Sequence, residues 1–450
     1  MNFDRQLISG QQGLLEKGIL ELSRQDAELA RLLDDEVVRQ HNTLSLVASC
    51  CTVDPRTLAA SASALVNVTA EGGPGKRYHA GCLNVDKVES LAIERAKSLF
   101  GAQYANVQSH SASNANYQVF SALLKPGDTF LGMSLDHGGH LTHGSPVTVS
   151  GTFYKAIGYG TTDEGLIDYE EVRRLAHEHH PKLIVCGATA YSRVVDFARF
   201  REIADEVGAI LMADISHIAG LVATGLHPSP VDHAHITTTC THKQLAGPRG
   251  GLILSGRDAN DTVPGFNLPF SRILDRAVFP MMQGAPAVNI IAAKAAAFGY
   301  AQKPEFKQYI TRIRHAADTI ADAFNAHGYE VIGGQTNNHT VLIKLRGELT
   351  GTIAEEALEE CGITVNKNRI PGETRSSFVT SGLRIGTGAL AQRHMDEIGC
   401  KKVVELVCRI LDVVQILSEK EYRLNSELRD GFINEVQSVC RDYPILSYTQ

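Results

Sequence analysis

The sequence has no tryptophan, only 6% aromatic residues, and no apolar run approaching the roughly 18–20 residues that a membrane-spanning helix needs. It also lacks a Lys/Arg-rich run of the kind that binds nucleic acid, and its 43 basic and 50 acidic side chains give a net charge of −7. With 43% hydrophobic residues and 40 glycines, the 450 residues do not resemble a coiled coil, a collagen-like fibre or a disordered tail. We expect a large globular chain of two or three domains, with neither membrane nor nucleic acid as a partner.

The nine cysteines are an odd number, include no C-x-x-C pair and form no Cys/His cluster at zinc-binding spacing. We therefore expect no disulfide framework and no metal site, and we interpret the thiols as reduced and mostly buried. Residues 1–5 lack the basic and apolar regions of a signal peptide. A cytoplasmic location is the expectation.

Hydrophobic periodicity predicts a helical N-terminal arm over residues 1–45, because leucines recur there at helical spacing among charged residues. Residues 46–299 are predicted to form a large domain, in which apolar strands at 182–186 and 209–213 flank a helix at 200–207. This order is typical of parallel α/β layering, in which ligands bind beyond the carboxyl ends of the strands.

The carboxyl third has a different pattern. Helices at 287–298 and 306–327 lead to strands at 340–345 and 362–365, and further helices follow. This order predicts a smaller α+β domain over residues 300–450. Because no low-complexity linker separates the two parts, we expect them to be tightly packed.

Asp214 and Lys243 are suited to cofactor chemistry. Asp214 ends an apolar strand, where a buried carboxylate needs a donating or cationic partner, although an exposed aspartate that caps the next helix is an equal alternative. Lys243 follows a run of hydroxyl residues and precedes a glycine-rich turn, a setting suited to an imine and a phosphate. Pyridoxal phosphate needs a Schiff-base lysine, an aspartate on its pyridine nitrogen and donors for its phosphate. Taken singly, Lys243 leaves open the alternative of an arbitrary surface lysine.

Two further clusters combine small and polar residues. In residues 135–145 three histidines alternate with paired glycines, which allows metal binding but favours a tight turn against a flat ligand, with the ring of His140 facing it. Residues 111–116 open a helix with small hydroxyl side chains, either an anion-binding helix start or an ordinary cap.

The chain resembles serine hydroxymethyltransferases over nearly its whole length. The segments that carry the resemblance are 70–72, 75–78, 137–145, 241–243, 245–251, 365–368 and 380–387. The resemblance implies a fold-type I pyridoxal-phosphate transferase of the α/β class, with a large mixed or parallel-sheet domain and a smaller C-terminal α+β domain. It also implies a homodimer or homotetramer whose active sites are shared between subunits.

The resemblance implies roles for single residues. Lys243 would be the Schiff-base lysine and Asp214 the partner of the pyridinium nitrogen, with His140 stacked on the ring. The remaining cofactor residues would be His217 and Thr189 near the phenolic oxygen, Ser111, Ala112 and Ser113 at the phosphate, Gly284 from the neighbouring subunit, and Thr69 beside the cofactor.

The implied substrate site uses a second set of residues. Ser49 and Arg384 would bind the amino-acid carboxylate, since a guanidinium fork matches two oxygens. Glu71 would be the acid/base group, and the expected catalytic set is Lys243, Glu71, His79 and His242, with His79 also at the substrate. The tetrahydrofolate cleft matches at Leu135, Gly139, His140, Leu141, Asn368 and Phe378, with Ser376 and Ser377 alongside.

The departures from the family pattern gather at the expected site. Thr69, Gly73 and His79 stand where the family usually has tyrosine. Other changes are Cys50 and Cys51 for Glu and Asn, Ala112 and Ala285 for Gly, and Cys240 for Thr. Loss of an aromatic side chain at Thr69 leaves apolar space, which costs about 24 cal/mol per Å³ unless it is filled. A methyl group on the substrate α-carbon would fill it.

The leading hypothesis is therefore a 2-methylserine hydroxymethyltransferase of one-carbon and amino-acid metabolism, which would transfer the hydroxymethyl carbon to tetrahydrofolate and leave alanine, in the D form. Ordinary serine hydroxymethyltransfer is one alternative. A folate-independent aldolase or transaldolase is another, because the imidazole of His79 can move protons near pH 7. A non-catalytic binding protein on the same fold is a third, disfavoured by the retention of Lys243, Asp214, Glu71 and Arg384.

Overall fold

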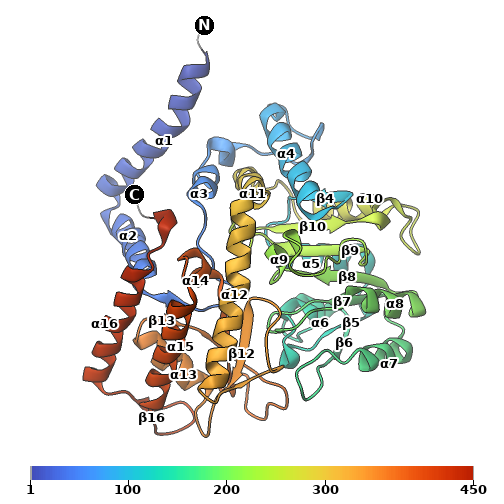
Figure 1. Cartoon of the computed structure of the whole chain (residues 1–450). Coiled ribbons are helices and arrows are strands. Elements are labelled where there is room, and N and C mark those ends of the chain that lie inside the picture. The colour runs from blue at the N-terminus through green and yellow to red at the C-terminus, as the bar shows by residue number, and fades with distance from the viewer. Residues whose placement is uncertain (1–2, 449–450) are drawn as a thin grey trace.

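The computed structural model describes residues 3–448 (Figure 1). Met1 and Asn2, part of the segment considered above for a signal peptide, lie outside the described residues, as do Thr449 and Gln450 of the predicted carboxyl domain. Among residues 3–448, no helix is both long and apolar enough to cross a membrane.

The predicted N-terminal arm consists of two helices. They are α1 (Phe3–Gln25) and α2 (Ala27–Asn42). The chain breaks at Asp26 because the Asp26 side chain accepts a hydrogen bond from the Leu29 N–H and so caps α2. No side chain of α2 is buried within this chain, and α1 extends away from the rest of the molecule (Figure 1).

A seven-stranded mixed sheet forms the larger part of the structure. Its strands, in spatial order, are β4 (Tyr104–Asn106), β10 (Gly251–Ser255), β9 (Ile236–Cys240), β8 (Ile210–Asp214), β7 (Leu183–Cys186), β5 (Thr129–Met133) and β6 (Lys155–Tyr159). Strands β9, β8, β7, β5 and β6 are parallel, whereas β10 runs antiparallel to both of its neighbours. The predicted α/β fold with a large mixed sheet is confirmed.

Helices cover both faces of this sheet, because successive strand residues point to opposite faces. In β8, Ile210 and Met212 belong to one apolar core, while Leu211 and Ala213 belong to the other. The helices are α4 (Leu83–Phe100), α5 (Ala112–Leu123), α6 (Val149–Phe153), α7 (Tyr169–His179), α8 (Phe197–Val207), α9 (Ala219–Ala223), α10 (Phe270–Arg276) and α11 (Val288–Ala301). Helix α8 begins three residues before its predicted start, because the Asp196 side chain caps it.

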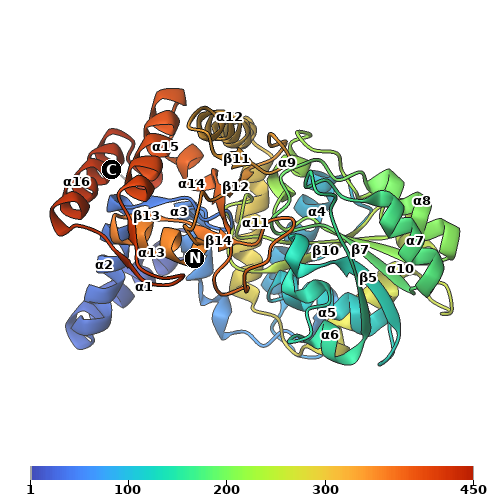
Figure 2. The ribbon, with the colours of Figure 1, turned by 90° about the horizontal axis from the view of Figure 1, so that it is seen from below.

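A four-stranded antiparallel sheet carries the carboxyl third. Its order is β11 (Glu330–Val331), β12 (Thr340–Lys344), β15 (Gly382–Gly386) and β14 (Asn366–Asn368). A separate apolar core joins it to α12 (Pro304–Ala326), α13 (Gly351–Glu360), α14 (Gly388–Gln392), α15 (Glu397–Asp412) and α16 (Ser426–Asp442). Figure 2 shows these helices on one side and the large sheet on the other, with α11 between them.

Short elements complete the described chain. They are α3 (Pro55–Ser61), the two-stranded pairs β1 (Leu44–Ser45) with β13 (Ile363–Thr364), β2 (Gly72–Gly73) with β3 (Lys76–Arg77) and β16 (Gln415–Ile416) with β17 (Tyr422–Arg423), the 3₁₀ turns Ala64–Asn67, Leu135–His137, Leu141–His143, Arg257–Asn260 and Leu446–Tyr448, and the π turn Ala277–Met282. The proposed domain boundaries at 45/46 and 299/300 stay a prediction, and the second falls within α11.

Candidate active site

The site lies where the parallel strands end. Strand β8 ends at Asp214, β9 ends three residues before Lys243, and β7 ends three residues before Thr189. Because the carboxyl ends of parallel strands meet at one edge of a sheet, residues far apart in the sequence surround one cavity there. Its lining is Ser111, Ala112, Ser113, His140, His143, Ala188, Thr189, Asp214, Ser216, His217, Cys240, His242, Lys243 and Arg249.

Asp214 is a buried carboxylate with several donors. The Asn116 side chain donates to its Oδ2 atom over 2.9 Å, and the Ser216 N–H donates to Oδ1 over 3.0 Å. The His143 Nε2 atom lies 3.2 Å from Oδ2. Burial alone raises the pKa of Asp214, but the hydrogen bond and charge of His143 outweigh it and hold that pKa well below its usual range. A permanently charged carboxylate therefore faces the cavity.

Lys243 is a buried lysine in the same lining. Burial lowers the pKa of its amine, while the nearby Cys240 and Asp214 oppose that shift. A lowered pKa increases the fraction of the amine that is neutral, and therefore nucleophilic, at a given pH. The loop after Lys243 turns tightly, with Ala246 at a φ of +49° and the Gly247 N–H bonded to the Thr241 carbonyl over 2.8 Å.

Helix α5 points its N-terminus into the cavity. Ser111 is its N-cap and accepts a hydrogen bond from the Asn114 N–H over 3.1 Å, so Ala112 and Ser113 occupy the first turn. The free N–H groups and the dipole of a 12-residue helix suit a phosphate.

Four histidines line this cavity, and a fifth, His339, supports one of them. Burial lowers the pKa of His140 to about 4 and that of His242 to about 4, so both rings are neutral near pH 7. His217 is buried, and its ring stacks on His339 with centroids 5.6 Å apart. The Nδ1 atom of His217 and the hydroxyl of Thr189 are buried without a hydrogen-bond partner in the described chain. Unpaired polar atoms at a cavity indicate that a ligand supplies their partners.

This set of groups fits pyridoxal phosphate. An amine, a charged carboxylate, a helix N-terminus and a neutral imidazole all line one cavity, and the orphaned His217 and Thr189 atoms match the expected place of the phenolic oxygen. Among residues 3–448, no group of three or more His, Cys, Asp and Glu side chains is arranged to hold a metal ion.

Arg384, on β15, reaches this region from the small sheet. Its Nη1 donates to the Thr189 carbonyl over 3.1 Å and its Nη2 to the Asn366 side chain over 2.9 Å, while Nε is buried and unpaired. Burial lowers the pKa of its guanidinium to about 10, so it stays charged. The Gly386 N–H bonds the Leu46 carbonyl over 2.7 Å, which brings the segment with Ser49 alongside β15.

Glu71 and His79 lie together, but they do not line the cavity that holds Lys243. The Glu71 Oε2 and His79 Nε2 atoms are 3.2 Å apart. A Cβ atom placed on Gly284 would lie 3.2 Å from the Glu71 Oε1 atom. Thr69, two residues before Glu71, is exposed. Within one chain these four residues therefore form a second group, separate from the cavity.

Most of the expected folate residues are exposed. Leu135, Leu141 and Phe378 are exposed, as are Ser376 and Ser377 in the loop that joins β14 to β15. Gly139 packs so tightly that an added Cβ would meet the Met133 carbonyl.

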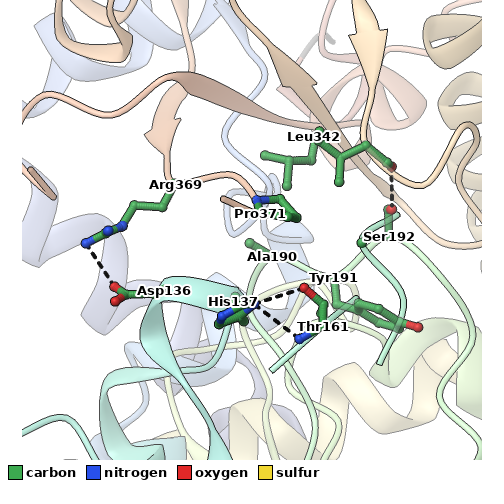
Figure 3. A pocket seen from close by; sticks show the side chains of 12 residues that line it. Asp136, His137, Thr161, Ala190, Tyr191, Ser192, Leu342, Arg369 and Pro371 are labelled. Carbon is green, nitrogen blue, oxygen red and sulfur yellow. Dashed lines mark hydrogen bonds and ion pairs between the residues drawn. The ribbon is translucent and has the colours of Figure 1, made fainter. Parts of the chain in front are cut away.

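Asn368, the last residue of β14, precedes Arg369, whose guanidinium pairs with Asp136 over 3.0 Å (Figure 3). The neighbouring His137 is held by Thr161 in the same view.

Sequence reasoning assigned no role to His143, Asn116 or His339. The signal for His143 was present, since it lies in the same histidine and glycine cluster as His140. Asn116 lay in the predicted helix start 111–116 but received no role of its own, and nothing in the sequence singled out His339. Only folding shows that Asn116 bonds Asp214 and that His339 supports His217.

Two comparisons place the chain among known proteins. The family profile for serine hydroxymethyltransferase matches residues 22–407. The chain is also similar to a serine hydroxymethyltransferase of Dichelobacter nodosus (strain VCS1703A), with 49% identity over 421 residues that cover 93% of this chain and 97% of that protein.

Proposed function

The chain belongs to the serine hydroxymethyltransferase family, and from that premise we propose that it moves the hydroxymethyl group of 2-methylserine to tetrahydrofolate. The family uses pyridoxal phosphate, with tetrahydrofolate as co-substrate. 2-Methylserine and tetrahydrofolate would give D-alanine, 5,10-methylenetetrahydrofolate and water. The observation that carries the specificity is Thr69, a small exposed side chain where the family usually has tyrosine.

The proposal gives roles to five residues of the chain. Bound pyridoxal phosphate supplies an electron sink for the bond that breaks at the substrate α-carbon. Lys243 would bind it covalently, and the charged Asp214 would keep its ring nitrogen protonated. Arg384 and Ser49 would hold the substrate carboxylate, and Glu71 would transfer the proton of the substrate hydroxyl.

The separate group of Glu71, His79, Thr69 and Gly284 supports a site shared between two subunits. In that arrangement each subunit lends this group to the cavity of its neighbour. Mixing Lys243→Ala and Glu71→Gln subunits tests it, because a mixed dimer then contains one complete site. Random exchange between two inactive parents would restore about a quarter of the wild-type rate in a two-fold dimer. No restoration would mean that both residues act in the same chain.

Substrate choice is tested by initial rates with 2-methylserine and with L-serine, each with and without tetrahydrofolate. Faster turnover of 2-methylserine that depends on folate is the expected result. The high identity to a serine hydroxymethyltransferase favours the other candidate, ordinary serine hydroxymethyltransfer, and faster cleavage of L-serine would establish it. A rate unchanged by omitting folate would support an aldolase instead.

A further inference from the structure

Glu71 sits on a short hairpin whose backbone is held from both sides. The hairpin pairs β2 with β3, and the Arg77 guanidinium donates to the carbonyls of Ala70 over 3.0 Å and Gly72 over 2.6 Å. These carbonyls flank Glu71 in the sequence. These hydrogen bonds fix the Glu71 backbone. The Glu71 side chain itself is half-buried.

A buried glutamine contacts the same carbonyl from another part of the fold. The Gln108 side-chain amide donates to the Gly72 carbonyl over 2.9 Å and to the Glu89 carboxylate over 2.7 Å. Glu89 in turn pairs with Arg77 over 2.5 Å. Gln108 and Glu89 are 5% and 2% exposed, so water does not compete for these bonds.

The backbone of Gln108 belongs to the segment that leads into the cofactor cavity. Ser111, the N-cap of α5, follows three residues later. The Lys294 ammonium binds the carbonyls on both sides of Gln108, those of Val107 over 2.6 Å and Ser109 over 2.9 Å. The Gln283 side chain donates to the Gln108 carbonyl over 3.0 Å. One residue thus connects the phosphate-binding segment to the Glu71 hairpin.

We propose that Gln108 is a positioning residue that sets the place of the Glu71 carboxylate through the Gly72 carbonyl. This inference rests on the acid/base role proposed for Glu71. Gln108 is not among the residues that line the cavity around Lys243, and its side-chain amide bonds Gly72 and Glu89. An effect that passes through Glu71 disappears when Glu71 is already replaced, and this distinguishes Gln108 from a residue that acts through the cofactor segment or only stabilises the fold.

A double-mutant cycle between Gln108 and Glu71 tests the proposal. Gln108→Leu should lower kcat by about 10–100-fold, because a misplacement of about 1 Å is worth up to 10²-fold, and should change KM by less than about two-fold. In the Glu71→Gln background the same change should have almost no effect on kcat. Gln108→Asn, which keeps the amide but is one methylene shorter, should also lower kcat. Gln302→Leu is the matched control, because the exposed Gln302 amide donates to the Arg95 carbonyl in α4 and not to the Glu71 hairpin.

Hydrogen exchange gives a readout that needs no turnover. The Tyr78 N–H donates to the Glu71 carbonyl over 3.1 Å, so its exchange reports the hairpin. Gln108→Leu should speed that exchange by about ten-fold or more, in line with a local opening made easier by one lost hydrogen bond. Unchanged exchange, or reductions in kcat that multiply in the double variant, would overturn the role of Gln108. A Glu71→Gln enzyme as fast as wild type would instead overturn the role of Glu71, and this inference with it.

Discussion

The Nε2 atom of His143 lies 3.2 Å from the Oδ2 atom of Asp214, and both side chains are buried. His143 and Asp214 are 71 residues apart in the sequence. Thr142, next to His143, receives a hydrogen bond from Asn116, which also donates to Asp214. Asp214 is thus held in place by two elements before any ligand arrives.

We expect His143→Leu to weaken pyridoxal phosphate binding, because Asp214 loses a donor and its charge becomes harder to maintain. A hydrogen bond to a charged group is worth about 1.5–3 kcal/mol, so the dissociation constant should rise roughly 10–150-fold. Fluorescence titration of the apoprotein measures it. In an Asp214→Asn background the same substitution should cost little, and equal costs in both backgrounds would contradict a role through Asp214. Asp163→Asn, at an exposed position, is the control.

Thr69→Tyr should shift the enzyme toward L-serine. The restored ring would occupy the space proposed for the substrate α-methyl group, and one methyl in a pocket is worth about 1–3 kcal/mol, or 10–200-fold in relative kcat/KM. The ratio of kcat/KM for 2-methylserine to that for L-serine measures the change. Thr69→Ser keeps the space open and should leave the ratio within about two-fold. An unaltered ratio in Thr69→Tyr would show that Thr69 does not determine specificity.

Much of this site follows from the sequence, and the missing part has a physical reason. Asp214 was singled out because it ends an apolar strand, and Ser111 because small hydroxyl residues start helices. These are local patterns of a few residues. His339 was missed because its contact with His217 requires the small sheet to dock on the large one. The absence of Glu71 from the cavity lining was also unforeseen. It depends on how the whole chain folds and not on any one motif.

The Arg369–Asp136 ion pair should tune the affinity for tetrahydrofolate. It ties the loop that carries Phe378 to the turn that carries Leu135 (Figure 3). Since both side chains are partly exposed, we expect a loss of about 0.2–1 kcal/mol, which raises KM for tetrahydrofolate by about 1.4- to five-fold in Arg369→Leu. The amino-acid KM should stay constant. Lys344→Met is the matched control. It removes the ion pair between Lys344 on β12 and Glu330 on β11 and should change neither KM.

Lys294→Met should destabilise the protein and weaken cofactor binding. The buried Lys294 side chain donates to the carbonyls of Val107, Ser109 and Gly251 over 2.6, 2.9 and 2.8 Å, so methionine removes one donor from each of them. The Ser109 carbonyl keeps a second donor, the Gly251 N–H at 2.9 Å. Each unpaired group costs about 1–3 kcal/mol, and removal of the burial cost of the charge offsets part of that loss. We expect a lower urea midpoint together with weaker pyridoxal phosphate binding. A lower midpoint with unchanged cofactor affinity would show that Lys294 supports the fold alone.

His339 should make the protein less stable in acid. Burial, reinforced by the charge of Lys243, lowers the pKa of His339 to about 3, whereas an unfolded histidine titrates near its ordinary value of 6.5. Between those values the unfolded chain binds more protons than the folded chain, so the free energy of unfolding falls as the pH drops below 6.5.

The full slope is about 1.4 kcal/mol per pH unit, and the loss from pH 7.5 to pH 5 should reach about 2 kcal/mol. Urea unfolding of the holoenzyme at several pH values measures this loss. His339→Gln keeps a donor for the Ala48 carbonyl but does not titrate. The difference in unfolding free energy between wild type and this variant should therefore shrink toward acid pH. The same difference at pH 7.5 and pH 5 would mean that the His339 ring takes up its proton without opening the contact with Ala48.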